Sequence, residues 1–127
     1  MPTQKQKKTE TSGIVRHAKR ISKLMLEKKA LDIKIIDVRK ITTLTDFFII
    51  CTSESEPQTR AITDHIHEQM KKDGIKVWHI EGYGNLDWVL MDYVNIVVHV
   101  FSRESRDYYD LDRLWADGKI SLIQDKE

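Results

Sequence analysis

Hydrophobic residues recur along this chain with two periods, one typical of helices and one typical of strands. Ile14, Ala18, Ile21 and Met25 follow one another at steps of four, three and four. This spacing places them on one face of a helix, which we expect to end before Ala30.

Two strands are predicted next. Residues 32–39 ("DIKIIDVR") are rich in β-branched side chains, and residues 47–52 ("FFIICT") are apolar without interruption. An unbroken apolar run of this length is typical of a strand buried on both faces, so we expect the second strand to lie centrally in a sheet.

The clearest helix follows these strands. Ser55 with Gln58 three residues later fits a capping box, and Pro57 falls in the first turn, where its missing N–H is harmless. Gly74 is expected to end this helix. Ser53 and Ser55 stand where free backbone amides could bind an anion, although capping the helix is the simpler role.

Residues 75–82 ("IKVWHIEG") are expected to return as a strand. A hairpin follows at 87–101, and residues 105–118 ("SRDYYDLDRLWADG") predict a last helix with Tyr108, Leu111 and Trp115 on one side. The order αββαβββα predicts an α/β fold in a single domain, with a mixed sheet of about five strands and few helices.

The hairpin "DWVLMDYVNIVVHVF" is apolar on both faces. In its first arm Trp88, Leu90 and Asp92 share one face and the intervening residues share the other, because side chains alternate along a strand. If three helices do not cover both sides of the sheet, part of one face is free for a partner. A hairpin covered on both sides by its own domain is the alternative.

Composition fits an ordinary soluble domain. The chain has 127 residues, of which 40% are hydrophobic and 32% charged. It contains no apolar run long enough for a membrane-spanning helix, and its first residues lack the apolar core of a secretory signal. Cys51 is the only cysteine, so no internal disulfide is expected and a reducing, cytoplasmic location is favoured.

Charge is distributed unevenly. Up to residue 23 the chain has seven basic residues and one acidic residue, a net charge of +6, whereas the remainder has 14 basic and 19 acidic residues, a net charge of −5. Lys5, Lys7, Lys8 and Arg16 are therefore candidate contacts to RNA. The alternative is a solubilising, frayed terminus.

Four segments carry a resemblance to a known family. They are "ALDIKIIDV", "TDFFIICTSESEPQTRAI", "EGYGNLDWVLMDYVNIVVHVF" and "RDYYDLDRLW". In this order and at this spacing the chain closely resembles the ribosomal silencing factor family, also called the Iojap or RsfS family. We accordingly assign residues 1–13 to a basic, flexible leader, 14–118 to the silencing-factor domain and 119–127 to a C-terminal tail.

The resemblance implies a nucleotidyltransferase-like fold that is not known to catalyse a reaction. Such proteins bind a ribosomal protein on the inter-subunit face of the large ribosomal subunit, where they sterically prevent the small subunit from joining. This represses translation when nutrients are short, and organelle relatives assist large-subunit assembly. No membrane partner is expected, while a homodimer that covers an apolar face in the free protein is one arrangement the sequence allows.

The family pattern places the contact with the ribosomal protein on two short segments. These segments supply Trp88, Leu90, Asp92, Tyr108, Tyr109, Asp110 and Leu111. Large aromatic side chains give rigid contact area, and a carboxylate can pair with a basic partner. The alternatives are that the tryptophan belongs to the core and that the tyrosine motif only packs the last helix on the sheet.

The chain departs from the family at the hairpin turn. Val94 and Asn95 stand where relatives usually have Gly-Asp, so a turn that needs a positive φ at residue 94 would be strained. His99 matches the family's strand histidine, and we expect it to be a satisfied core residue.

No pattern of catalytic or metal-binding residues stands out. We therefore predict no cofactor, no metal and no catalytic step. The alternative is a divergent, metal-dependent nucleotidyltransferase that uses Asp37 or Asp92, two acids on separate predicted strands. Asp110 and Asp112 would diverge on a helix, because residues two apart do not share a face.

Overall fold

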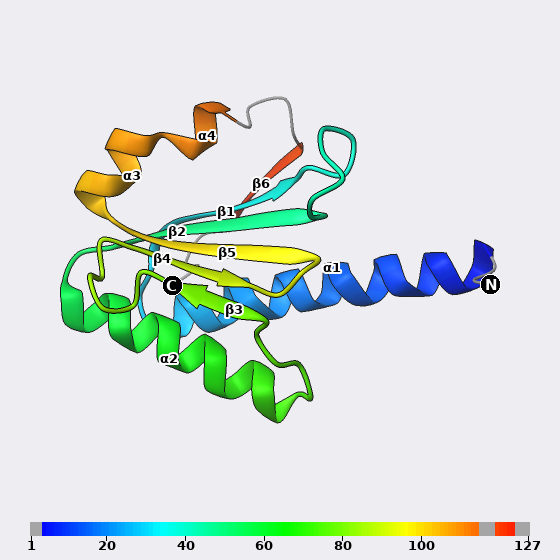
Figure 1. Cartoon of the computed structure of the whole chain (residues 1–127), viewed down its shortest axis with the longest axis horizontal. Helices are drawn as coiled ribbons and strands as arrows, with labels where there is room; N and C mark the ends of the chain where they lie inside the picture. The colour runs from blue at the N-terminus through cyan, green and yellow to red at the C-terminus, as the bar shows by residue number, and fades with distance from the viewer. Residues whose placement is uncertain (1–3, 115–118, 124–127) are drawn as a thin grey trace.

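The computed structural model describes residues 4–114 and 119–123, and it confirms a mixed α/β fold (Figure 1). The elements are α1 (Gln4–Glu27), β1 (Leu31–Asp37), β2 (Phe47–Ser53), α2 (Glu56–Lys72), β3 (His79–Glu81), β4 (Trp88–Asp92), β5 (Ile96–Ser102), α3 (Arg103–Tyr109), α4 (Leu111–Leu114) and β6 (Lys119–Ile123). The predicted order is correct through β5. After that strand, two short helices and a further strand replace one helix.

The strands form one sheet in the order β3-β4-β5-β2-β1-β6. Only β2 and β5 run parallel among these strands, and the other neighbours are antiparallel. As predicted, β2 lies in the middle of the sheet, and its last five residues are all buried. Its apolar sequence is needed because helices or neighbouring side chains cover both of its faces.

The sheet has six strands, not about five. Strand β6 pairs antiparallel with β1, from Ile33 opposite Ile123 to Asp37 opposite Lys119. The assignment of 119–127 to a tail was therefore wrong for residues 119–123. A segment of five residues is too short to show a clear period in the sequence, and its partner is distant along the chain.

Helices α1 and α2 cover one face of the sheet (Figure 1). The core on this side joins Ile21 of α1 and Ile66 of α2 to Ile49, Cys51 and Val98 of the central strands, all of them fully buried. Burial raises the pKa of the Cys51 thiol to about 12, so this cysteine is an unreactive core residue, as predicted.

Helix α1 begins at Gln4, so residues that we assigned to a leader are helical in the structure. Its N-terminal half extends past the end of the sheet, whereas its C-terminal half packs on the core (Figure 1). None of the described helices, α1 included, combines the length and apolar character that crossing a bilayer requires.

Helices α3 and α4 lie on the opposite face of the sheet. The predicted single helix is broken at Asp110, whose backbone is left-handed with a φ of 48° and which caps the end of α3. Leu111 then packs against Ile36, Ile50 and Phe101 in a second, smaller core. Trp115, which we placed on the same helix, lies outside the described residues.

Strand β3 is shorter than predicted and sits at the edge of the sheet. The loop that leaves it passes close to β4: a Cβ atom added to Gly82 would lie 2.0 Å from the carbonyl oxygen of Trp88. Gly82 also has a φ of 83°. Glycine is therefore required here, both for the close approach and for the backbone conformation.

Candidate docking face

Strand β4 presents different residues to the two sides of the sheet. Val89 and Met91 point into the core beneath α1 and α2 and are fully buried. Trp88, Leu90 and Asp92 point to the other side and stay partly exposed. The predicted division of this strand into a core face and a more accessible face is confirmed.

Strand β5 continues the accessible side. Val97 lies opposite Asp92 and is also partly exposed, while His99 lies opposite Leu90. We call Trp88, Leu90, Asp92 and Val97 the open face. Helix α3 packs near the Trp88 end of this surface, so helices cover the second side of the sheet only in part.

Trp88 is held in one orientation by a hydrogen bond and by ring contacts. Its indole N–H donates to Nδ1 of His99 at 3.0 Å. Its ring stacks on Phe101 with 4.9 Å between centroids and contacts Tyr109 at 4.7 Å. Trp88 therefore packs against the second core and still offers part of its surface, which combines the two roles that the sequence left open.

His99 is buried, with 4% of its surface exposed, and only one of its ring nitrogens has a partner among the described residues. Because Nδ1 accepts from Trp88, the proton of the neutral ring is on Nε2, which makes no hydrogen bond there. Burial lowers the pKa of His99 to about 3. The expectation of a satisfied core histidine is thus only half correct, and the ring is neutral at physiological pH.

Two tyrosines of α3 extend the open face. Tyr108 is 80% exposed and Tyr109 is 48% exposed, and their rings meet edge to face at 5.0 Å. We call them the tyrosine pair. Asp110, which follows them, is exposed, whereas Leu111 is buried with 9% of its surface accessible. Of the four residues predicted in this motif, the structure brings Tyr109 directly onto Trp88 and places Leu111 beneath the surface.

A partly buried ion-pair network holds α3, which carries the tyrosine pair, against the sheet. The guanidinium of Arg106 donates to both oxygens of Asp112 at 2.9 Å and to the hydroxyl of Thr52 at 2.8 Å. Lys34 of β1 lies 2.6 Å from the same carboxylate. Although burial opposes it, hydrogen bonding from Arg106 and Lys34 lowers the pKa of Asp112 to about 2. We call Lys34, Arg106 and Asp112 the clamp.

Sequence reasoning missed the clamp. Arg106 and Asp112 are six residues apart, a spacing that does not bring side chains together on a continuous helix. They meet because the left-handed backbone at Asp110 turns the chain between α3 and α4. The residues between them, Asp107 to Leu111, include two further acids, so the sequence does not single out Asp112 as the partner of Arg106.

The hairpin turn is strained, as the sequence predicted. Val94 has a φ of 74°, and the N–H of Asn95 donates to the carbonyl of Tyr93 at 2.9 Å, which closes a γ-turn. The carboxylate of Asp92 accepts from the backbone N–H of Val94 at 2.7 Å. Asp92 therefore holds the turn with one oxygen at the edge of the open face.

The two carboxylates of the enzyme alternative do not converge. Asp92 lies on β4, and Asp37 lies on β1, three strand spacings or about 14 Å away. The register puts Ile36, not Asp37, in line with Asp92, so the two acids point to opposite faces. Asp37 instead binds Arg39 at 2.6 Å. Within the described ranges, no three potential metal ligands cluster together.

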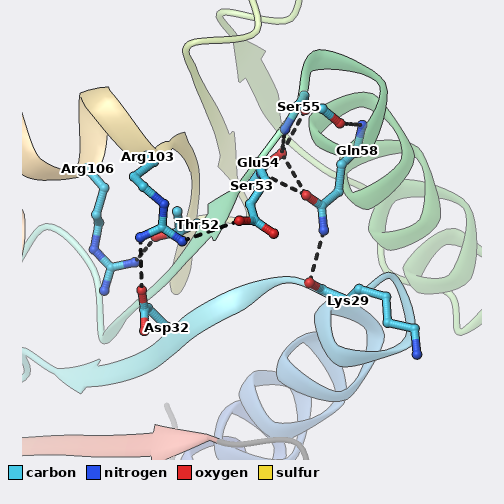
Figure 2. Close-up of polar contacts among 9 residues, drawn as sticks. All are labelled: Lys29, Asp32, Thr52, Ser53, Glu54, Ser55, Gln58, Arg103 and Arg106. Carbon is cyan, nitrogen blue, oxygen red and sulfur yellow. Dashed lines mark hydrogen bonds and ion pairs between the residues drawn. The ribbon is translucent and has the colours of Figure 1, made fainter.

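A second polar region lies where the parallel strands end (Figure 2). The hydroxyl of Ser55 accepts from the N–H of Gln58 at 3.1 Å, which confirms Ser55 as the helix cap. Gln58 accepts from the N–H of Glu54 and donates to the carbonyl of Lys29. The predicted capping box is thus shifted by one residue, and its glutamine also ties α2 to the end of α1.

A cavity of about 300 Å³ adjoins this region between the ends of β2 and β5. Its wall includes four acids and one base, namely Glu54, Glu56, Asp87, Glu104 and Arg103. Arg103 itself lies 3.8 Å from Glu54 and 4.0 Å from Asp32 (Figure 2). An acidic wall disfavours a bound anion, so the structure gives no support to the anion site considered for Ser53 and Ser55.

The four candidate RNA contacts all lie on α1. Lys5, Lys7 and Lys8 fall in its first two turns, and Arg16 is exposed farther along the helix. Helix α1 packs on the face of the sheet opposite the open face, and its N-terminal half extends past the end of the sheet (Figure 1). The structure therefore separates the two groups of predicted contacts.

A family model described as "Ribosomal silencing factor during starvation" matches residues 11–127. The chain belongs to the ribosomal silencing factor family. The match takes in every strand of the sheet and the whole open face, so the surface described above is part of the family domain.

Relatives of known name agree with this assignment. The ribosomal silencing factor of Bacillus subtilis (strain 168) is 39% identical over 95 residues, which cover 75% of this chain and 80% of that protein. Protein Iojap of Zea mays chloroplasts is 33% identical over 98 residues, covering 77% of this chain and 42% of that longer protein.

Two crystal structures share the fold. A protein of Chromobacterium violaceum has a TM-score of 0.71 and 34% identity, covering 84% of this chain and 92% of that one. A protein of Bacillus halodurans also has a TM-score of 0.71, with 31% identity and coverage of 89% and 98%. The silencing-factor fold therefore accounts for nearly the whole chain.

Proposed function

We propose that this protein binds the large ribosomal subunit and blocks joining of the small subunit by occupying its inter-subunit face. The partner would be a ribosomal protein exposed on that face, and the result would be repression of translation when nutrients are limiting. The action is steric and needs no catalytic step. Membership of a family named for ribosomal silencing supports the ribosome as partner.

The observation that carries this proposal is the fixed position of Trp88 on the open face. A tryptophan held by the imidazole of His99 and by Phe101 loses little conformational entropy when a partner binds it. Fixed aromatic side chains with part of their surface exposed are typical of the residues that dominate binding energy at protein interfaces.

The surroundings of Trp88 complete a contact surface of mixed character. Leu90 and Val97 supply apolar area, and the tyrosine pair adds aromatic surface with hydroxyl groups. Asp92 offers one carboxylate oxygen that is not needed by the turn, and this oxygen can pair with a basic side chain of the ribosomal protein. Leu111 and the clamp would act from beneath by holding α3 in place.

Sedimentation with isolated ribosomal subunits tests the proposal. The protein should co-sediment with the large subunit and not with the small subunit, and in excess it should reduce formation of the joined ribosome. Failure to bind the large subunit, or normal joining with the protein bound, would refute it. Binding only to incomplete large subunits would instead assign the protein to subunit assembly.

Two variants locate the contact. Tyr108→Ala removes a side chain that is 80% exposed, and Leu90→Arg places a charge on the open face without touching the clamp. Each should weaken binding about fivefold or more, since the residues that dominate an interface cost more than ~1 kcal/mol when they are removed. Trp78→Ala is the matched control, because Trp78 is 72% exposed and lies outside the open face.

A further inference from the structure

The outward side of helix α1 carries basic side chains at helical spacing. Arg16, Lys19 and Lys23 are separated by three and four residues and are all exposed. Ala18 and Ile21, on the opposite side of the helix, are buried in the core. The three basic residues therefore share the face that points away from the sheet.

These three residues lie close together along the helix. From Arg16 to Lys23 they span seven residues, or about 10 Å at 1.5 Å per residue. We call Arg16, Lys19 and Lys23 the basic row. Helix α1 begins at Gln4, so Lys5, Lys7 and Lys8 precede the basic row on the same helix.

The basic row has only weak compensation from described acids: Lys23 interacts with the carboxylate of Glu27 at longer range, but that carboxylate is hydrogen-bonded to His65. Arg20 is paired with Asp73 at 3.0 Å, and Glu27 is paired with His65 at 2.7 Å. By contrast, no ion pair within 4.0 Å involves the three exposed basic residues in the part of the chain that the structure describes. The positive charge of this face is therefore directed at solvent or at a partner.

We propose that the basic row binds the phosphate backbone of double-stranded RNA. Evenly spaced cations neutralise phosphates and release counterions without reading bases. Single-stranded nucleic acid is normally held on aromatic side chains, and the basic row contains none. An amphipathic helix that enters a membrane must free its apolar face, but here Ile21 and Met25 are committed to the core.

The rest of the molecule restricts this contact to α1. The first 23 residues have a net charge of +6 and the remainder has a net charge of −5, so the rest of the chain taken as a whole disfavours phosphate. The basic row and the open face lie on opposite sides of the sheet. A ribosome-bound molecule would thus contact a protein on one side and RNA on the other. That the phosphate belongs to RNA rests on the proposed function.

Fluorescence anisotropy with a labelled RNA hairpin tests the contact without ribosomes. The triple variant Arg16→Gln, Lys19→Gln and Lys23→Gln should bind at least about tenfold more weakly at 0.1 M salt. The slope of log affinity against log salt should fall by up to about three, close to one for each phosphate that is no longer neutralised. The N-terminal truncation that begins at Gly13 should weaken binding further.

The matched control removes the same charge elsewhere. Lys71, Lys72 and Lys76 are exposed around the end of α2, and their triple glutamine variant should keep the affinity and salt slope of the unaltered protein. Equal losses in both triple variants would overturn the proposal, as they would indicate only a general effect of charge.

Two further outcomes separate this inference from the proposed function. Unchanged RNA binding in the basic-row variant would refute the inference, and it would do so even if the protein still blocks subunit joining. If that variant still binds the RNA hairpin but no longer binds vesicles of phosphatidylserine, the basic row binds a membrane surface instead. A Leu90→Arg variant that no longer binds the large subunit but still binds the RNA hairpin would support two independent contacts.

Discussion

Val94 stores strain in the hairpin turn. A β-branched residue at a φ of 74° costs on the order of 1–3 kcal/mol, and the surrounding hydrogen bonds to Asp92 and Tyr93 hold it there. The strain lies at the edge of the open face, where 56% of the valine is exposed. A partner that contacts this edge would therefore meet a turn of defined shape.

Replacing Val94 by glycine should stabilise the protein. Relief of the strain outweighs the extra flexibility of glycine in the unfolded chain, so we expect the free energy of unfolding to rise by about 1 kcal/mol. Urea denaturation measures this change. Asn95→Gly, at a position without a positive φ, is the control and should be neutral or destabilising. A loss of stability in Val94→Gly would show that packing of the valine side chain contributes more free energy than the strained turn costs.

His99 should make stability fall in mild acid. Its pKa is about 3 in the folded protein and near 6.5 when unfolded, so between these values only the unfolded chain binds a proton at this site. The contribution is complete above pH 6.5 and is lost progressively toward pH 3, with a slope of up to about 1.4 kcal/mol per pH unit. Urea denaturation at a series of pH values measures the slope.

The control for this pH dependence is a second histidine. His99→Phe should flatten the slope between pH 6 and 4, while His79→Phe, at a side chain that is 50% exposed on the edge strand, should leave it unchanged. If the slope survives in His99→Phe, other groups titrate in this range and His99 is not the cause.

Helices α3 and α4 depend on the clamp more than on apolar packing, since α3 buries only Arg106 and α4 contributes Leu111. When one member of such an ion pair is removed, the charge of the other member is left uncompensated. The tyrosine pair is attached to this segment. Its orientation is therefore coupled to an ion pair about one helix turn away.

Asp112→Asn should destabilise the protein by about 2 kcal/mol and loosen α3 and α4 selectively. Hydrogen exchange should show loss of protection in Arg103–Tyr109 and little change in β2. Asp107→Asn, at an exposed acid on the same helix, is the control.

Because the pKa of Asp112 is about 2 when folded and 3.8 when unfolded, its stabilisation is complete above pH 3.8 and is lost between pH 3.8 and 2.

The sequence predicts elements whose signals are local. The apolar run 47–52 identified a central strand, and Ser55 identified the start of α2, because strand burial and helix capping depend on neighbouring residues. The break at Asp110 was missed because helical periodicity continues across it from Tyr108 to Leu111. The open face could be proposed from alternation in β4, but the positions of His99 and Asp112 depend on distant partners, Trp88 and Lys34.

Across the whole molecule, β6 forms one edge of the sheet and covers the outer side of β1. Five positions of β1 have a partner in β6, from Ile33 to Asp37. Without β6 the edge strand would be β1, which has seven residues against five in β6, and a longer edge of unpaired backbone groups favours association with other chains. Strand β6 is thus an integral strand of the sheet, although it lies after the last of the four sequence segments that resemble the family.

Deleting residues 119–127 should lower the free energy of unfolding by about 3 kcal/mol, from several backbone hydrogen bonds of ~1 kcal/mol each, and should promote aggregation. Denaturation and size-exclusion chromatography measure the two effects. A deletion of residues 124–127 alone retains β6 and should change neither. Equal stability of the longer deletion and the complete chain would show that β6 pairing contributes nothing in solution.

The parallel pairing of β2 with β5 has a consequence for how the protein is made. Strands β1 and β2 can pair with each other early, but β2 also pairs with β5 and β1 also pairs with β6. These second partners are not available until most of the chain has been synthesised. Non-local pairing of this kind slows folding, and it leaves strand edges exposed in the nascent chain. A protein proposed to block the joining of ribosomal subunits would therefore form its own docking face only late in its own translation.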